Sequence, residues 1–338
     1  MTSVSTSSPR VSRRLVWLVL IGVFLVVVAS LTPLSLFLQL PSRLNLFATV
    51  FLGIFIEAIP YLLFGTFISG LVEVFLDRSL MMRFISKRAF PAAISGALMG
   101  LVFPVCECGV IPLTRRLFHK GLPLPAGIAF LLAAPVFNPI VIFSTAAAFG
   151  WGPMLLWRVG LTLLIAITVG LVFGVEDDPA NILQTVALSV HDHEHTNDEK
   201  LVFGSQIHQA LLICADEFFE MGRYLVIGAI LAAGLQTFIP QTALLAIGSG
   251  SILSVLVMLA LAILLSICST VDAFVALGFV GTFSFGSILS FLVFGPMVDI
   301  KSTLMYLQVF RRKPVAYLIL IPFLASVLAG IAFNYFAP

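Results

Sequence analysis

The chain has 338 residues, of which 60% are hydrophobic and 10% are charged. A soluble globular protein is about 45–50% apolar and about 25% charged, so this composition predicts a polytopic membrane protein surrounded by a lipid bilayer. It excludes disordered, fibrous, secreted and nucleic-acid-binding classes. The net charge of +2 says little about partners, because the topology of a membrane protein depends on where its Lys and Arg lie.

The first 44 residues predict a retained transmembrane helix. A Ser/Thr-rich N-terminus with Arg10, Arg13 and Arg14 precedes an apolar run from Leu15 to Leu38. The run reaches the length of a membrane span, and no small-residue cleavage site is clear after it. We therefore expect a multi-pass protein of the inner (cytoplasmic) membrane with its N-terminus in the cytoplasm.

The rest of the chain divides into two permease repeats joined by one polar loop. We assign residues 45–174 to the first repeat and 205–338 to the second, with an acidic, His-containing cytoplasmic loop at 175–204. The apolar stretches after the first helix fall at 44–76, 91–113, 124–149, 151–174, 205–239, 251–281, 286–309 and 315–336.

The cations around the stretch 91–113 predict that it enters and leaves the membrane on the same side. Four cations lie at 78–88 before it, and Arg115, Arg116 and Lys120 follow it. The positive-inside rule places both flanks in the cytoplasm, so the stretch turns back near residues 104–109. A simple span is the alternative, and it would leave the three following cations outside.

An internal repeat supports this architecture. Glu57, Cys106 and Pro135 recur as Glu220, Cys268 and Pro296 after 161 to 163 residues, with similar neighbours. The sequence therefore predicts an all-α polytopic membrane protein with one extra N-terminal helix plus two inverted repeats. Each repeat has a re-entrant or broken helix, as in secondary transporters.

The segment 104–112 carries the residues best suited to bind a solute. Two prolines and a glycine interrupt helical pairing there, and Cys106, Glu107 and Cys108 occupy the interruption. Thiolates are natural ligands for soft ions and trivalent arsenic, whereas a carboxylate can hold a proton or a hard cation. The alternative is that both Cys pack as small apolar side chains.

The equivalent segment of the second repeat offers Cys268, Thr270 and Asp272. A carboxylate such as Asp272 is costly in the membrane unless it is paired or wet, so we assign it to proton coupling and Cys268 and Thr270 to substrate binding. The alternative for these residues is a hydrogen-bonded packing role.

A second pair of interruptions contains Asn138 and Asp299. Either residue can cap the helix that follows, and the same geometry can direct a helix N-terminus at a substrate. Lys301 either pairs with Asp299 or snorkels to the cytoplasmic face.

Two acids lie inside long apolar spans at equivalent positions. Glu57 and Glu220 are candidates for the coupling proton, since intramembrane acids commonly serve as proton relays. Arg223 lies one helical turn after Glu220, so a structural ion pair is the alternative there. We expect Asp216 and Glu217 nearer the membrane interface.

The run His191, His193 and His195 can bind zinc or nickel and gather metal at the loop, or it is an ordinary polar loop segment. Cys214 has no Cys or His nearby in the sequence, which favours packing.

Four motifs in order give the chain a resemblance to a known family. Residues 106–112, 134–139, 268–274 and 294–299 are similar to those of the predicted permeases that include the ArsP organoarsenical exporters, with Glu107 where the more usual motif has Ser. The resemblance implies a proton-coupled exporter of trivalent organoarsenicals, or one subunit of a two-component permease with a second membrane protein.

We therefore predict a secondary transporter, not an enzyme, with no cofactor and no Walker-type nucleotide loop. Its substrate is a small solute that Cys106, Cys108 and Cys268 bind, with Glu107, Asp272 and Glu57 either holding the coupling proton or shaping the electric field. The rivals are a permease for a divalent metal such as zinc, an intramembrane thiol oxidoreductase, and a scaffold subunit that transports nothing without its partner.

Overall fold

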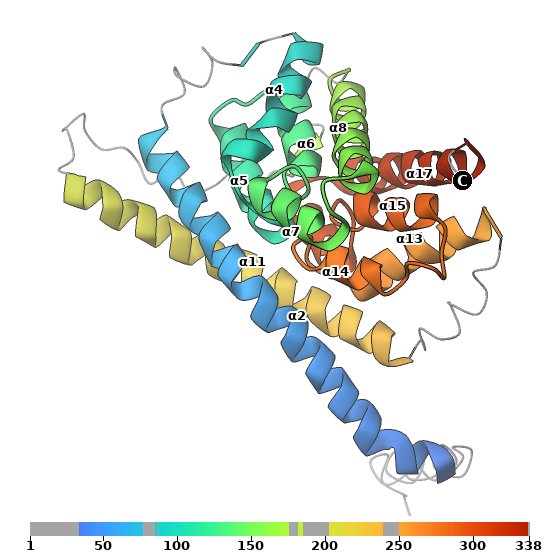
Figure 1. Cartoon of the computed structure of the whole chain (residues 1–338). Helices are drawn as coiled ribbons and strands as arrows, with labels where there is room; N and C mark the ends of the chain where they lie inside the picture. The colour runs from blue at the N-terminus through green and yellow to red at the C-terminus, as the bar shows by residue number, and fades with distance from the viewer. Residues whose placement is uncertain are drawn as a thin grey trace, which may run out of the picture. The chain divides into compact units, whose positions relative to one another are not determined.

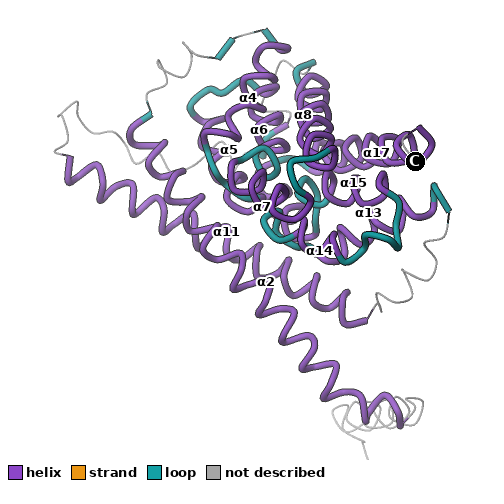
Figure 2. Tube along the Cα trace, viewed as in Figure 1, coloured by secondary structure: helices purple, strands orange, loops and turns teal. Residues whose placement is uncertain are grey.

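The computed structural model describes residues 34–76, 85–86, 88–175, 182–184, 203–238 and 250–336. Within these ranges the regular structure is helical and no strand is present, so the all-α prediction is confirmed (Figure 2). The chain forms two compact units, 1–48 and 49–338, and every site described below lies in the second.

In the described part of the chain, four helices are long and apolar enough to cross a membrane, which makes the chain a multi-pass membrane protein (Figure 1). A span needs about 20 residues for a hydrocarbon core about 30 Å thick. The first of these helices continues through residues 39–43, which separate the apolar run ending at Leu38 from the stretch 44–76. The four are α2 (Leu34–Phe75), α8 (Pro153–Phe173), α11 (Phe203–Phe238) and α17 (Arg312–Phe336).

Eight shorter helices of the described residues lie between the long ones, and none of these eight exceeds 14 residues. At 1.5 Å per residue such a helix covers at most about 21 Å, less than the thickness of the hydrocarbon core. They are α4 (Ala89–Val102), α5 (Glu107–His119), α6 (Leu124–Ala133), α7 (Pro139–Phe149), α13 (Leu253–Leu265), α14 (Asp272–Leu277), α15 (Phe285–Phe294) and α16 (Ile300–Val309).

The four predicted interruptions are observed as breaks between consecutive short helices, but the first is shorter than the predicted 104–112, because residues 107–112, with Pro112, lie inside α5. They lie at 103–106, 134–138, 266–271 and 295–299, and Pro104, Pro135 and Pro296 stand in three of them. Proline lacks the N–H that continues a helix, which explains these three breaks.

Along the described residues, one long helix, four short helices and one long helix follow each other twice. This order fits the division into two repeats. Their inverted orientation stays a prediction, as does the same-side return of the segment before α5.

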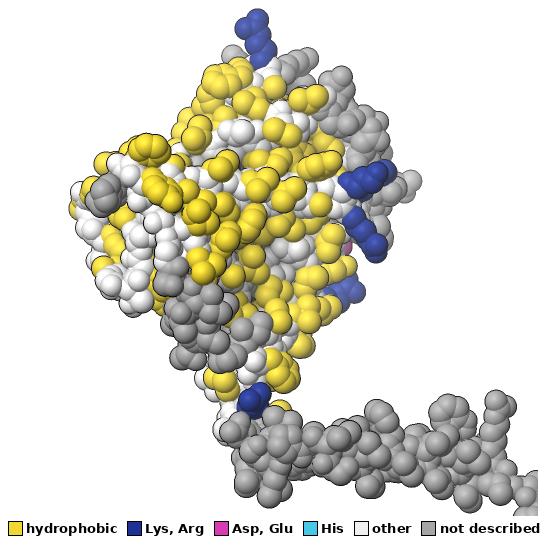
Figure 3. Space-filling view, turned by 90° about the vertical axis from the view of Figure 1, so that its right-hand side faces the viewer, with side chains coloured by type: hydrophobic (Ala, Val, Ile, Leu, Met, Phe, Trp, Pro, Cys, Tyr) yellow, Lys and Arg dark blue, Asp and Glu magenta, His cyan; other side chains and the backbone are white. Residues whose placement is uncertain are grey.

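Small residues let the helices pack closely. A Cβ on Gly96 of α4 would lie 2.1 Å from the Ala126 carbonyl oxygen of α6, and a Cβ on Gly286 would lie 2.2 Å from that of Gly330. Helices in lipid gain no hydrophobic driving force from association, so close backbone packing supplies much of their attraction. The outer surface carries many exposed apolar side chains, and one face is covered mainly by them (Figure 3).

Candidate functional site

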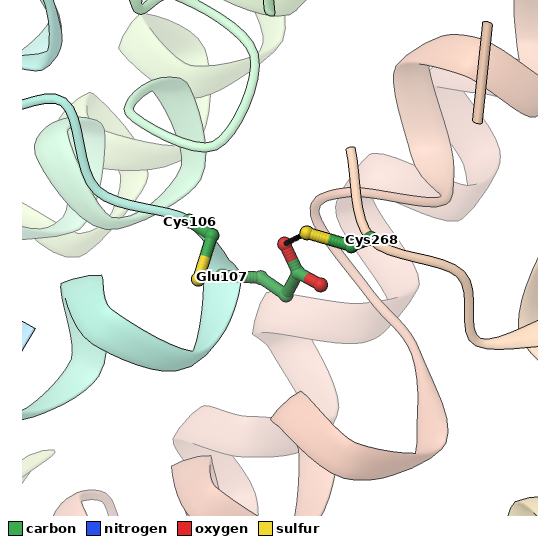
Figure 4. A group of neighbouring side chains, drawn as sticks. All are labelled: Cys106, Glu107 and Cys268. Atoms are coloured by element: carbon green, nitrogen blue, oxygen red, sulfur yellow. Dashed lines mark hydrogen bonds between the residues drawn. The ribbon is translucent and has the colours of Figure 1, made fainter. Parts of the chain in front are cut away.

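Two breaks, far apart in sequence, bring Cys106, Glu107 and Cys268 together. Cys106 caps the N-terminus of α5, Glu107 is the first residue of that helix, and Cys268 lies in the loop between α13 and α14 (Figure 4). One ligand atom from each of the three lies within 4.8 Å of the others, and all three side chains are buried. The Cys268 thiol donates a hydrogen bond to Glu107 Oε2 at 3.7 Å.

The local sequence fixes the first of these segments. The Cys106 carbonyl accepts the N–H groups of Gly109 and Val110, which starts α5 immediately after the break. Glu107 lies in the first turn, at the positive end of the helix dipole. Gly109 approaches Gly65 of α2 so closely that a Cβ on Gly65 would lie 2.3 Å from the Gly109 Cα.

Ser266 turns the chain into the loop that carries Cys268. It has φ 46°, the left-handed conformation that a residue with a Cβ rarely adopts. Its hydroxyl donates to the Ile263 carbonyl at 2.9 Å, and the Ile300 N–H donates to that hydroxyl oxygen at 3.4 Å. These contacts hold the end of α13 beside the start of α16.

Lys301 places a buried positive charge beside the thiols. Its Nζ lies 3.4 Å from Asp299 Oδ2 and 3.7 Å from Glu107 Oε1, and its side chain is 3% exposed. Asp299 is held in turn by a capping box, in which the Ser302 N–H donates to Asp299 Oδ1 at 2.6 Å. Of the two predicted positions for Lys301, pairing with Asp299 is therefore observed, and snorkelling is not.

A small cavity, too narrow to hold a water molecule, lies against this cluster. Glu57 of α2 lines it, and Glu57 Oε1 has no hydrogen-bond partner among the described residues. Thr270, Asn138, Asp272 and Glu220 are not among its lining residues. The lining consists of Ile54, Glu57, Ala58, Cys106, Glu107, Cys108, Cys268 and Lys301.

Asn138 caps α7, which confirms one of the two roles predicted for this residue. Its Oδ1 accepts the Val141 N–H at 3.0 Å, and its Nδ2 donates to the Ala134 carbonyl at 2.9 Å. The carbonyl oxygen of Thr270 accepts a hydrogen bond from the Ser144 hydroxyl. A substrate-binding role for either residue stays a prediction.

Asp272 is bound to Arg158, a residue that the sequence analysis did not single out. Arg158 Nη2 lies 2.6 Å from Asp272 Oδ2, and Nη1 donates to Thr145 Oγ1 at 2.7 Å. The Arg158 side chain has no exposed surface. The sequence did contain a signal for this pair, because Arg158 is the one charged residue in the apolar stretch 151–174 and a charge buried in a membrane requires a partner.

Glu220 also has an arginine partner, but a distant one in sequence. Arg115 Nη1 lies 2.9 Å from Glu220 Oε2, and Gln308 donates to Glu220 Oε1 at 2.6 Å. The ion pair suggested with Arg223 is not among those of the described residues.

Glu217, expected nearer the interface, is buried and binds Arg116. Glu73 lies 3.8 Å from Arg116 and 3.5 Å from Lys120.

The His191, His193 and His195 run lies outside the described residues, so metal binding there stays a prediction. Cys214 is buried and lies 3.5 Å from the Thr66 hydroxyl, in agreement with a packing role. All four cysteines are free thiols.

Residues 43–335 match the family described as predicted permease, ArsP_1. The chain is 45% identical over 302 residues to the UPF0718 protein YcgR of Bacillus subtilis, covering 89% of this chain and 98% of that protein. It is 36% identical over 282 residues to a Streptococcus mutans protein named "Putative two-component membrane permease complex subunit", covering 83% and 92%. No solved structure matches the chain.

Proposed function

Because the chain belongs to the predicted permease family, we propose that it is a secondary transporter of a soft, thiol-reactive solute, with trivalent organoarsenicals as the substrate class. The observation that carries the proposal is the meeting of Cys106 and Cys268, two thiols from separate broken helices, beside Glu107. Soft thiolate ligands select soft ions, and two thiols can hold one trivalent arsenic.

The reaction with such a solute needs no other reagent. Methylarsonous acid carries two hydroxyl groups, and each thiol that forms an As–S bond gives its proton to one departing hydroxyl, which leaves as water. Two thiols and one neutral arsenical therefore yield one neutral adduct and two waters. The reverse reaction releases the solute.

A solute bound to both thiols connects the two halves of the predicted repeat. Cys106 belongs to the first half and Cys268 to the second, so formation of the adduct can bias their relative motion during alternating access. We propose export from the cytoplasm across the cell membrane, with the N-terminus on the cytoplasmic side.

Among the acids predicted to hold the coupling proton, Glu57 fits this role best. It lines the cavity and has an oxygen without a hydrogen-bond partner in the described residues. Asp272 and Glu220 are instead bound by Arg158 and Arg115. An acid bound by a guanidinium is less able to load and release a proton during transport.

The rival solute is a divalent metal such as zinc. Two thiols and a carboxylate with ligand atoms within 4.8 Å of one another form a suitable first set of ligands for it. One relative carries the name "Putative two-component membrane permease complex subunit". The proposal therefore includes a second membrane protein as a possible partner of this chain.

Protection of the thiols from alkylation tests the solute. Purified chain in proteoliposomes is treated with a membrane-permeant maleimide, with methylarsenite, zinc or neither, and each Cys is quantified by mass spectrometry. We expect methylarsenite to reduce labelling of Cys106 and Cys268 together, with the protection of each lost when the other is replaced by Ser. Protection by zinc alone would move the protein to metal transport, and protection by neither would contradict the proposed site.

Cys214→Ser is the matched control for this experiment. Cys214 is also buried, but its contact is with Thr66 and not with the cluster. We expect this variant to show the protection pattern of the wild type. Methylarsenite efflux from liposomes containing this chain alone would show that it transports without a second subunit, whereas efflux that requires a partner would support the two-component interpretation.

A further inference from the structure

We propose that Lys301 sets the charge selectivity of the thiol cluster, excluding divalent cations while admitting a neutral thiol-reactive solute. This inference rests on the proposed function, because it concerns which solute the same thiols accept. Lys301 is buried, and its ammonium lies 3.4 Å from Asp299 and 3.7 Å from Glu107.

The backbone around Lys301 holds the ammonium in this position. A Cβ on Gly228 of α11 would lie 2.9 Å from the Lys301 Cα, so the absence of a side chain at Gly228 allows α16 to approach α11. The capping box of Asp299 and Ser302 fixes the first turn of α16, in which Lys301 lies. The backbone of Lys301 is therefore fixed beside the site, and its buried side chain is not a surface charge.

Without this ammonium, the cluster would be a good site for a soft divalent cation. The thiols of Cys106 and Cys268 and a carboxylate oxygen of Glu107 lie within 4.8 Å of one another, and Cys108 lines the same cavity. Asp299 Oδ2 is buried and has no hydrogen-bond partner among the described residues apart from the approach of the ammonium. Soft thiolates together with carboxylates bind Cd²⁺ and Zn²⁺ well.

The ammonium opposes such a cation in two ways. It neutralises carboxylate charge that the cation would otherwise use, and it repels a second positive charge in surroundings of low dielectric constant. The neutral arsenical is indifferent to the ammonium, since exchange of its hydroxyls for thiols changes no net charge. Lys301 thus separates two solute classes that thiols alone would both bind.

Cadmium binding to the full chain in lipid nanodiscs tests this inference. Cd²⁺ is the probe, and its ultraviolet Cd–thiolate charge-transfer absorption reports binding to the cysteines. We expect Lys301→Met and Lys301→Gln each to raise the affinity for Cd²⁺ at least about tenfold, which corresponds to about 1.4 kcal/mol. The gain should disappear when Cys268→Ser is added to either variant.

Two charge controls accompany these variants. Lys301→Arg keeps a positive charge at the site, and Lys313→Met removes one from an exposed position on α17. We expect Lys301→Arg and Lys313→Met to bind Cd²⁺ with an affinity within about twofold of the wild type. This change is smaller than the gain of about tenfold expected for Lys301→Met and Lys301→Gln. An unchanged affinity in folded Lys301→Gln would overturn the inference.

The wild type provides a second test that depends on no variant. Tight Cd²⁺ binding with the charge-transfer band in the wild type would contradict exclusion by Lys301 directly. The proposed function is tested separately, by measuring whether methylarsenite protects the wild-type thiols from alkylation. A chain that ignores methylarsenite but gains Cd²⁺ affinity on loss of Lys301 would refute the substrate class and retain the role of the ammonium.

Discussion

Two buried clusters of charge in this protein differ in how closely their members are bound. In the first, Arg158 contacts Asp272 at 2.6 Å and Thr145 at 2.7 Å, and none of these three residues lines the cavity. In the second, Lys301 lies 3.4 and 3.7 Å from its two carboxylates, beside three thiols and the cavity. The first is arranged as a structural ion pair, whereas the second has contacts loose enough to be exchanged.

The difference has a physical reason. A buried charge must be compensated, and short charge-assisted hydrogen bonds compensate it most fully. A site that binds a solute needs donors that are not already fully engaged. We therefore interpret the Arg158 cluster as support for the helices and the Lys301 cluster as the place where the solute binds.

The largest effect on stability is expected from Arg158→Met. Removing one partner of a buried pair leaves the other charge uncompensated, which costs about 3–5 kcal/mol. The measurement is the free energy of unfolding in SDS titration, and Arg158→Met combined with Asp272→Leu should recover most of the loss. Lys301→Met should lower the free energy of unfolding less. In that variant Glu107 still accepts the hydrogen bond of the Cys268 thiol, and Asp299 still accepts that of the Ser302 N–H. Equal losses for the two single variants would remove the distinction between the clusters.

A smaller effect is expected from Gly65→Ala, which tests how α5 is held in place. The new Cβ would lie 2.3 Å from the Gly109 Cα, and backbone at that position cannot move aside cheaply. Overpacking of this kind costs about 1–3 kcal/mol and should also weaken methylarsenite protection at Cys106. Gly53→Ala is the matched control on the same helix, since nothing lies within 4 Å of its added Cβ. A loss in Gly53→Ala equal to that in Gly65→Ala would show that the close contact is not the cause.

The smallest effect on stability is expected from Cys268→Ser. The hydrogen bond from its thiol to Glu107 is long, at 3.7 Å, so the change should cost less than about 1 kcal/mol. The same variant should lose methylarsenite protection at Cys106. A large loss of stability with unchanged protection would instead assign Cys268 to packing.

The sequence predicted the breaks of this fold better than its ion pairs. Pro104, Pro135 and Pro296 indicate three breaks because proline removes a helical donor, although Pro112 and Pro322 lie inside α5 and α17. The pairing of Asp272 with Arg158 depends on the packing of helices that are distant in sequence, which no local pattern encodes. For the same reason the sequence suggested Arg223 as a partner of Glu220, although Arg115 of α5 binds it.

The sequence likewise predicted one part of the candidate site and not the other. The repeat offset alone aligns Cys106 with Cys268, and the two thiols do lie near each other. Lys301 was expected either to pair with Asp299 or to reach the cytoplasmic face. Its approach to Glu107 depends on the close contact of α16 with α11 at Gly228, which only the tertiary structure reveals.

X-ray absorption spectroscopy of arsenic bound to the purified chain tests the central claim most directly, because it counts the sulfur atoms around the metalloid. The account predicts arsenic bound by sulfur in the wild type, one sulfur fewer in Cys268→Ser, and no change in Cys214→Ser. Arsenic surrounded by oxygen alone, or a sulfur count that Cys268→Ser leaves unchanged, would contradict a solute held jointly by the two broken helices.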